Sequence, residues 1–264
     1  MKIGIVSSWM ETLSLFSFLT RYNHEYVVYY DSLHAPYWAK NFATSLELIK
    51  NWIKYLKDQW VEKIIVPPVY ELALLKEWEE LILPLFKTYL LAYVFKHSLV
   101  WKLGLIWEYA DIQVMQVLVS EVSKEYSLTD DQKKIKKFSY PFHYWCKEEH
   151  ILNSILAKFS WRSYLTNSLV KYEFRYFKDA NVDTVIPCNY AYFNAQRTLS
   201  KLFNTKKTRF HWLKDIENIF SDLIWNGLKY SVSIYATDQV EYLKNTKKIM
   251  RYFQRWTSEE IKRL

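Results

Sequence analysis

The chain begins with MKIGIVSSW (residues 1–9), and a similar pattern of a lysine, an apolar run and one glycine returns as KLGLIW (residues 102–107). Two further segments correspond, since VEKIIVPPVYELA (61–73) and VDTVIPCNYAY (182–192) each place an acidic residue before an apolar run that reaches proline. Apolar strands that are each followed by a helix are typical of a parallel sheet covered on both faces. We therefore expect an α/β protein of two pseudo-symmetric lobes, each a mostly parallel sheet flanked by helices, with an active-site cleft between them.

Periodicity supports this fold class along the chain. Helical spacing of apolar residues predicts a helix over 43–56. Short apolar runs predict strands in the following segments: KIGIV (2–6), YVVYY (26–30), KIIVPP (63–68), LILPLF (81–86), KLGLIW (102–107), TVIPCN (184–189) and SVSIYAT (231–237).

Composition restricts the function classes. The net charge is +8, but the basic residues are scattered over several predicted helices, so we do not expect nucleic-acid binding. The longest apolar stretch, 81–101, is interrupted by two lysines and a histidine and predicts a strand followed by a helix, not a membrane span. The two cysteines, Cys146 and Cys188, form neither a CxxC pair nor a four-ligand pattern. With no signal-peptide pattern at the N-terminus, we expect a soluble, cytoplasmic protein without a structural metal.

Several motifs occur in the order typical of one enzyme family. The stretch DSLHAPYW (31–38) keeps the Asp, Ser, Pro and Tyr of the motif D-(T/S)-x-x-x-P-Y-G, and VIPCNYAY (185–192) keeps the cysteine of G-C-T-H-Y. The stretch IGIVSSW (3–9) keeps the serine of a D-S-G turn after the first strand. The chain thus resembles glutamate racemase, of the aspartate/glutamate racemase superfamily. The resemblance implies a first lobe of residues 1–97 plus 207–264 and a second lobe of residues 98–206.

The same resemblance implies a chemistry and a set of site residues. The family interconverts L- and D-glutamate for peptidoglycan without a cofactor, using two cysteines as acid/base groups on opposite faces of the α-carbon. It implies a small amino-acid substrate and allows a homodimer. The site residues that it implies are Cys188 as the catalytic acid/base, and Ser8, Pro36, Tyr37, Asn189 and Tyr190 for substrate binding.

Pro68 occupies the place of the family's first cysteine, and proline has neither an ionisable group nor an N–H. The two-base mechanism is therefore incomplete, and three functions stay open. The first is a racemase, active or inactive; the second is a non-catalytic binding or regulatory protein on the same scaffold. The third is a decarboxylase or isomerase that uses one cysteine.

The glycine content is unusually low. Average usage of about 7% would give roughly 18 glycines, whereas the chain has 3, together with 12 tryptophans. Trp9, Trp38, Trp60 and Trp107 each fall on a family glycine. Either these indoles fill the core of a diverged relative, or they are UGA codons that the source organism reads as glycine; UGG codons in the gene would exclude the second explanation.

Overall fold

The computed structural model describes residues 1–7, 15, 19, 24–31, 33, 34, 37, 40–98, 102–107, 112–126, 143–148, 164–190, 192, 196–203 and 231–237. The chain divides into two compact units, Met1–Leu83 with Phe220–Leu264 and Pro84–Ile219. The lobe boundaries expected from the sequence stay a prediction. In the described part, no helix is long and apolar enough to cross a membrane.

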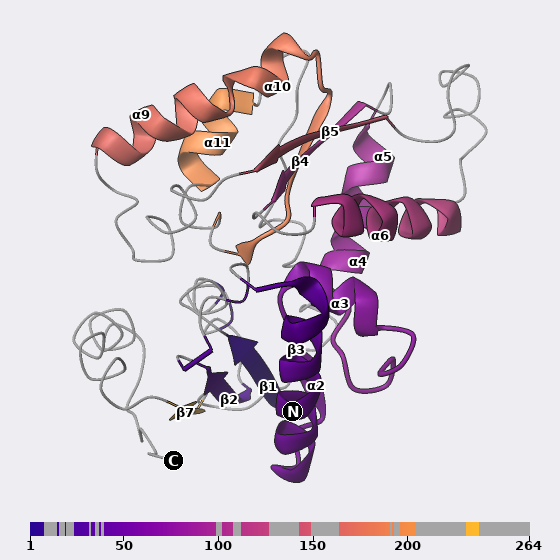
Figure 1. Cartoon of the computed structure of the whole chain (residues 1–264), viewed down its shortest axis with the longest axis vertical. Helices are drawn as coiled ribbons and strands as arrows, with labels where there is room; N and C mark the ends of the chain where they lie inside the picture. Colours follow the sequence, from indigo (N-terminus) through magenta and orange to yellow (C-terminus); the bar gives the residue numbers. More distant parts are fainter. Residues whose placement is uncertain are drawn as a thin grey trace. The chain divides into compact units, whose positions relative to one another are not determined.

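The first unit is built on a parallel four-stranded sheet of order β3-β1-β2-β7 (Figure 1). Its strands are β1 (Lys2–Ser7), β2 (Glu25–Tyr30), β3 (Lys63–Ile65) and β7 (Ser231–Ala236). Helices α2 (Phe42–Asp58) and α3 (Pro68–Leu74) complete its described elements. Strand β7 pairs with β2 although it comes from the far end of the chain.

The second unit contains a parallel three-stranded sheet of order β5-β4-β6. Its strands are β4 (Lys102–Trp107), β5 (His143–Glu148) and β6 (Thr184–Pro187). Its helices are α4 (Leu85–Tyr89), the π-helix η3 (Leu90–Val94), α5 (Phe95–His97), α6 (Ile112–Glu125), α9 (Tyr164–Glu173), α10 (Arg175–Asp179) and α11 (Gln196–Phe203). Helices α9 and α11 lie side by side (Figure 1), and the hydroxyl of Thr198 donates a hydrogen bond to Asn167 between them.

Helix α2 shows how the sequence forms a local element of the first unit. The side chain of Asn41 caps its N-terminus by accepting a hydrogen bond from the backbone N–H of Thr44 at 2.8 Å. Its apolar face, with Ile49, Ile53 and Leu56 fully buried, lies against the sheet. The helix predicted over 43–56 is confirmed.

The predicted fold class is confirmed, with parallel sheets flanked by helices in both units. One predicted strand is wrong: in LILPLF (81–86) only Ile82 forms a bridge, to Ile64, and α4 begins at Leu85. Pro84 precedes that helix and has no N–H for a sheet ladder, which explains the change from strand to helix. Strand β5 was missed because its sequence, HYWCKE, mixes aromatic and charged residues.

The two central strands, β1 and β4, each carry a glycine where a helix or loop packs on the sheet. A Cβ on Gly104 would lie 2.7 Å from Cδ1 of Phe177, and a Cβ on Gly4 would lie 3.1 Å from Cδ1 of Leu56. Neither glycine has a positive φ. Close packing therefore requires glycine at position 104, whereas position 4 is tight but leaves more room, and neither glycine is required by a turn.

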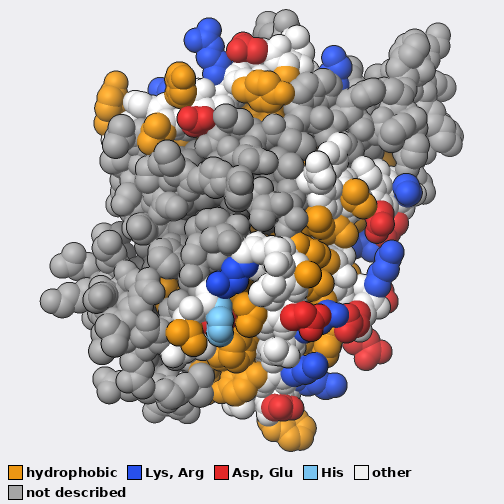
Figure 2. Space-filling view, viewed as in Figure 1, with side chains coloured by type: hydrophobic (Ala, Val, Ile, Leu, Met, Phe, Trp, Pro, Cys, Tyr) orange, Lys and Arg blue, Asp and Glu red, His pale blue; other side chains and the backbone are white. Residues whose placement is uncertain are grey.

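Acidic and basic side chains lie next to each other over the described part of the face in Figure 2. An ion pair of the first unit joins Lys50 of α2 to Glu77, with Nζ and Oε2 2.9 Å apart. This hydrogen bond raises the pKa of Lys50 and lowers the pKa of Glu77. The pair illustrates how part of the positive charge of the chain is balanced locally.

Candidate functional site

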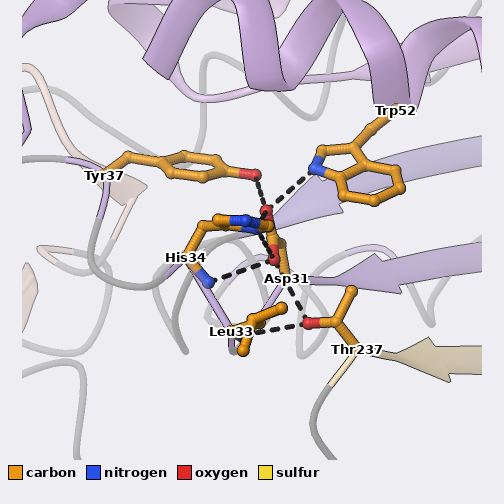
Figure 3. A network of polar contacts seen from close by, with 6 residues as sticks. All are labelled: Asp31, Leu33, His34, Tyr37, Trp52 and Thr237. Atoms are coloured by element: carbon orange, nitrogen blue, oxygen red, sulfur yellow. Dashed lines mark hydrogen bonds and ion pairs between the residues drawn. The ribbon is translucent and has the colours of Figure 1, made fainter. Parts of the chain in front are cut away.

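A buried carboxylate, Asp31, lies directly after β2 and is the centre of a polar network (Figure 3). Its side chain is fully buried. The hydroxyl of Tyr37 and the indole N–H of Trp52 each donate to Oδ2 at 2.8 Å, and the hydroxyl of Thr237 donates to Oδ1 at 3.2 Å. Burying a charge without such donors would be strongly unfavourable. The network therefore compensates for the burial of Asp31.

His34 also contacts this carboxylate. Its ring nitrogen Nδ1 lies 2.9 Å from Oδ1 and 3.1 Å from Oδ2 of Asp31, and its backbone N–H donates to Oδ1 at 3.3 Å. The side chain of His34 is 35% exposed, whereas that of Asp31 is 0% exposed. A buried acid thus holds a partly exposed imidazole on the turn that follows the strand.

Two other elements fix this turn. Thr237, the residue after β7, accepts a hydrogen bond from the backbone N–H of Leu33 at 3.0 Å. Trp52 of α2 stacks on Tyr29 with ring centroids 4.1 Å apart. Burial, together with the negative charge of Asp31, raises the pKa of Tyr29 well above its usual range, so this phenol stays neutral. The network therefore joins β2, β7 and α2 at the carboxyl end of the sheet, where open α/β sheets bind ligands.

Tyr37, predicted to bind substrate, is buried within this turn. Its backbone carbonyl accepts hydrogen bonds from the backbone N–H of Lys40 and from the hydroxyl of Ser45, both at 3.0 Å. Its ring makes an edge contact with Tyr70 of α3, which stacks in turn on Phe42. Its substrate-binding role stays a prediction. Ser8 and Pro36, and the tryptophans Trp9 and Trp38, lie outside the described residues.

Cys188, the predicted acid/base, is the first residue after β6 and is fully buried. Its backbone N–H donates to the carbonyl of Ile106 in β4 at 2.8 Å, and its thiol donates to the carbonyl of Ile186 at 3.6 Å. Asn189 and Tyr190 follow it and are both buried. The structure thus brings these three predicted residues together at the carboxyl end of β6.

Strand register identifies the counterpart of Cys188 in the first unit. Gly4 pairs with Ile64 in β3, and Gly104 pairs with Val185 in β6. Cys188 lies three residues beyond Val185, and the residue three beyond Ile64 is Pro67. The next residue, Pro68, is the one expected from the sequence, and it begins α3. Both residues are prolines. The first unit therefore has no thiol at the position that corresponds to Cys188, whether that position is taken from strand register or from the sequence motif.

Trp60 has the backbone of a glycine position. It follows α2, where its N–H donates to the carbonyl of Lys57, and its φ is 60°. Helices commonly end on a residue in this left-handed conformation, and that residue is usually glycine. Its indole is 86% exposed. Trp107 is the last residue of β4, and the side chain of Trp107 lies outside the described part of the structure.

Sequence reasoning did not identify His34, Trp52 or Thr237 as members of this network. The aspartate of DSLHAPYW was visible, but Thr237 lies 206 residues away from it. A useful signal was Trp52 itself, since a buried indole N–H usually has a hydrogen-bond partner. Among the described residues, no group of three or more His, Cys, Asp or Glu could hold a metal ion.

No protein-family model and no curated protein sequence matches the chain. Solved structures do match it. Glutamate racemase from Francisella tularensis, crystallised with D-glutamate, has a TM-score of 0.75 at 16% identity over 100% of this chain and 97% of that chain. For isoform RacE1 from Bacillus anthracis the TM-score is 0.72 at 13% identity, over 98% and 96% of the two chains. For the Campylobacter jejuni enzyme it is 0.67 at 20% identity, over 94% and 97%.

The chain is therefore an α/β protein of two domains with parallel sheets. More particularly, it has the racemase fold of the glutamate racemases, as the motifs in its sequence predicted.

Proposed function

We propose that this protein is a glutamate-racemase-like isomerase that moves the α-proton of a small amino acid without a cofactor. The observation that carries the proposal is the position of Cys188, at the carboxyl end of β6 and followed directly by Asn189 and Tyr190. The Francisella tularensis structure with D-glutamate supports glutamate as the substrate. In this proposal Cys188 exchanges a proton with the α-carbon, and the product supplies D-glutamate for peptidoglycan in the cytoplasm.

The polar groups nearby have defined tasks in this reaction. The amide of Asn189 and the phenol of Tyr190 can hydrogen-bond a substrate carboxylate. A carboxylate held by donors accepts more of the charge that develops when the α-proton leaves. Substrate binding by these residues is what makes the α-proton acidic enough to remove.

A second function is favoured by one specific observation. The position expected for a first cysteine is Pro67 by strand register and Pro68 by the sequence motif. Cys188 is therefore the only thiol at a strand end in the described part of the chain. A single thiol can still catalyse one-sided proton transfer, as in decarboxylation with proton return or in cis-trans isomerisation. Cys188 is fully buried, and this burial would also fit an inert thiol in a non-catalytic binding protein.

Proton exchange separates these functions. Purified protein is incubated with L-glutamate in D₂O, and deuterium at the α-carbon is followed by NMR while the D-isomer is measured by chiral chromatography. Exchange together with racemisation supports the racemase, exchange alone supports single-base chemistry, and neither supports the binding protein. The Cys188→Ala variant should lower racemisation by about 10²–10⁴-fold. Wild-type racemisation by this folded variant would show that Cys188 is not the acid/base.

A further inference from the structure

The first unit contains a buried acid paired with a partly exposed histidine, and the reaction proposed above uses neither of them. We propose that this pair, Asp31 and His34, is a binding site for a small alkylammonium ion, which donates a hydrogen bond to Nε2 of the neutral His34 ring. The inference concerns the first unit alone and does not depend on the proposed function. It rests on the tautomer of the ring, on the charge of the pair and on the exposure of the turn.

The contact with Asp31 determines the tautomer of the ring. An ionised carboxylate only accepts hydrogen bonds, so Nδ1 of His34, at 2.9 Å from Oδ1 of Asp31, is the nitrogen that carries the proton. In the neutral ring Nε2 is then an acceptor, and it makes no hydrogen bond within the described part of the chain. Successive hydrogen bonds polarise one another, so the bond to Asp31 makes Nε2 a better acceptor. A ligand of this site must therefore bring a donor.

The charge of the pair favours a donor that is a cation. Tyr37, Trp52 and Thr237 donate to Asp31 from the turn, from α2 and from the end of β7, and all three are neutral groups (Figure 3). Among the described residues, His34 is the only side chain in contact with Asp31 that can become a cation. With a neutral ring the pair keeps the negative charge of the carboxylate, which attracts an ammonium group. An anion would need a protonated ring, and it would then meet a pair without net charge.

The turn is accessible to such a ligand. The side chain of His34 is 35% exposed, and its neighbour Leu33 is 65% exposed. The two side chains lie next to each other on the turn that follows β2 (Figure 3), at the carboxyl end of the parallel sheet, where open α/β sheets bind ligands. An exposed leucine offers apolar surface to the carbon chain of an amine. An imidazole acceptor next to an apolar side chain fits an alkylammonium ion.

Titration with small probes tests the site directly. The full-length protein, labelled with ¹⁵N, is titrated at pH 8 with n-propylammonium, and the ring nitrogens of its histidines are followed by NMR. Two matched probes each change one property: tetramethylammonium keeps the charge but has no N–H donor, and propanoate keeps the three carbons but reverses the charge. We expect saturable shifts of the His34 ring with n-propylammonium, and binding of the other two probes that is weaker by about 10-fold or more.

Asp31 is a positioning residue in this proposal, and Asp31→Asn should reverse the preference of the site. The amide of asparagine can donate to Nδ1, which places the ring proton on Nε2. Nε2 then donates instead of accepting, and the negative charge is absent. We expect this variant to bind n-propylammonium about 10-fold more weakly than wild type and to bind propanoate more tightly. A purely structural role of Asp31 would weaken the binding of both probes.

Histidine variants assign the binding to one ring. His34→Asn should abolish saturable binding of n-propylammonium. His97→Asn is the matched control, because Nδ1 of His97 contacts a backbone carbonyl, that of Tyr93, at 2.8 Å, and not a carboxylate. We expect this variant to bind all three probes as the wild type does.

Three results would overturn the proposal. The first is a folded wild-type protein in which n-propylammonium gives no saturable shift of the His34 ring. The second is tighter binding of propanoate than of n-propylammonium by wild type, which would indicate a protonated ring that binds anions. The third is equal binding of tetramethylammonium, which would show that Nε2 is not the acceptor. If His34→Asn does not fold, the wild-type titration decides alone, with the ring signals assigned by through-bond correlation. None of these measurements includes racemisation, so the site and the proposed function can fail separately.

Discussion

Replacing Gly104 by alanine tests whether close packing, and not chance, retained the rare glycines. The new Cβ would lie 2.7 Å from Cδ1 of Phe177, well inside the 3.4 Å at which ordinary contact begins. It would also lie 2.9 Å from Cε1 of the same ring and 3.1 Å from Val182. One added methyl group therefore needs a shift of the ring or of β4.

The surroundings of Phe177 restrict such a shift. Its ring is fully buried and packs against Phe174, Phe203 and Tyr176, with ring centroids 6.2, 6.3 and 5.6 Å away. Overpacking of this kind costs about 1–3 kcal/mol. Alanine at a compatible φ recovers about 0.4–1 kcal/mol by restricting the unfolded chain. We expect a net loss of about 1–2 kcal/mol in the free energy of unfolding.

The assay is urea unfolding followed by circular dichroism, with Gly4→Ala as the matched control. A Cβ on Gly4 meets the flexible end of Leu56 at 3.1 Å and Ile64 at 3.2 Å. The cost of overpacking should therefore be small at this position and should nearly cancel the gain from restricting the unfolded chain. Phe177→Leu combined with Gly104→Ala should cost less than the sum of the two single changes. The packing argument is refuted if Gly104→Ala unfolds at the same urea midpoint as the wild type, or at the same midpoint as Gly4→Ala.

Two further predictions concern single side chains of the first unit. His24 is buried with no hydrogen-bond partner for either ring nitrogen in the described part of the chain, and burial, then the nearby N-terminal ammonium, lowers its pKa from the usual 6.5. The unfolded chain therefore binds the extra proton more readily, so the free energy of unfolding should fall as the pH drops below about 6.5. His24→Phe should reduce the loss of unfolding free energy between pH 7 and pH 5.5, measured by urea titration. The same loss in wild type and variant would show that His24 is not its source. Trp60→Gly should raise the melting temperature by about 2–4 °C, because glycine adopts a φ of 60° without strain. Asn181→Gly, at a φ of 52°, should raise it less because asparagine tolerates this conformation, and equal shifts would show that Trp60 is not strained.

Local patterns predicted what depends on neighbours in the sequence. The strands of both sheets, apart from β5, follow from short apolar runs, and α2 follows from the helical spacing of its apolar residues. LILPLF was misassigned because its apolar content is compatible with both states and Pro84 determined the outcome.

The candidate site depends on contacts that no local pattern contains. The motif around Asp31 was visible, but its pairing with His34 and Trp52 follows only from the fold. The positive φ of Trp60 was likewise not readable from composition, although its place on a family glycine pointed to it. Because the backbone of Trp60 has a conformation that favours glycine, the codon of Trp60 is the one that best tests whether UGA is read as glycine.

The hydrogen bond between Thr237 and Asp31 also bears on how the protein is made. The two residues are 206 positions apart, and β7 pairs with the outer edge of β2. While the ribosome is still adding the intervening residues, that edge of β2 is unpaired, and the buried carboxylate lacks one of its donors. An open strand edge can pair with other chains, so a nascent protein in this state is prone to aggregate. Synthesis of β7 therefore completes the first sheet and its polar network in one event.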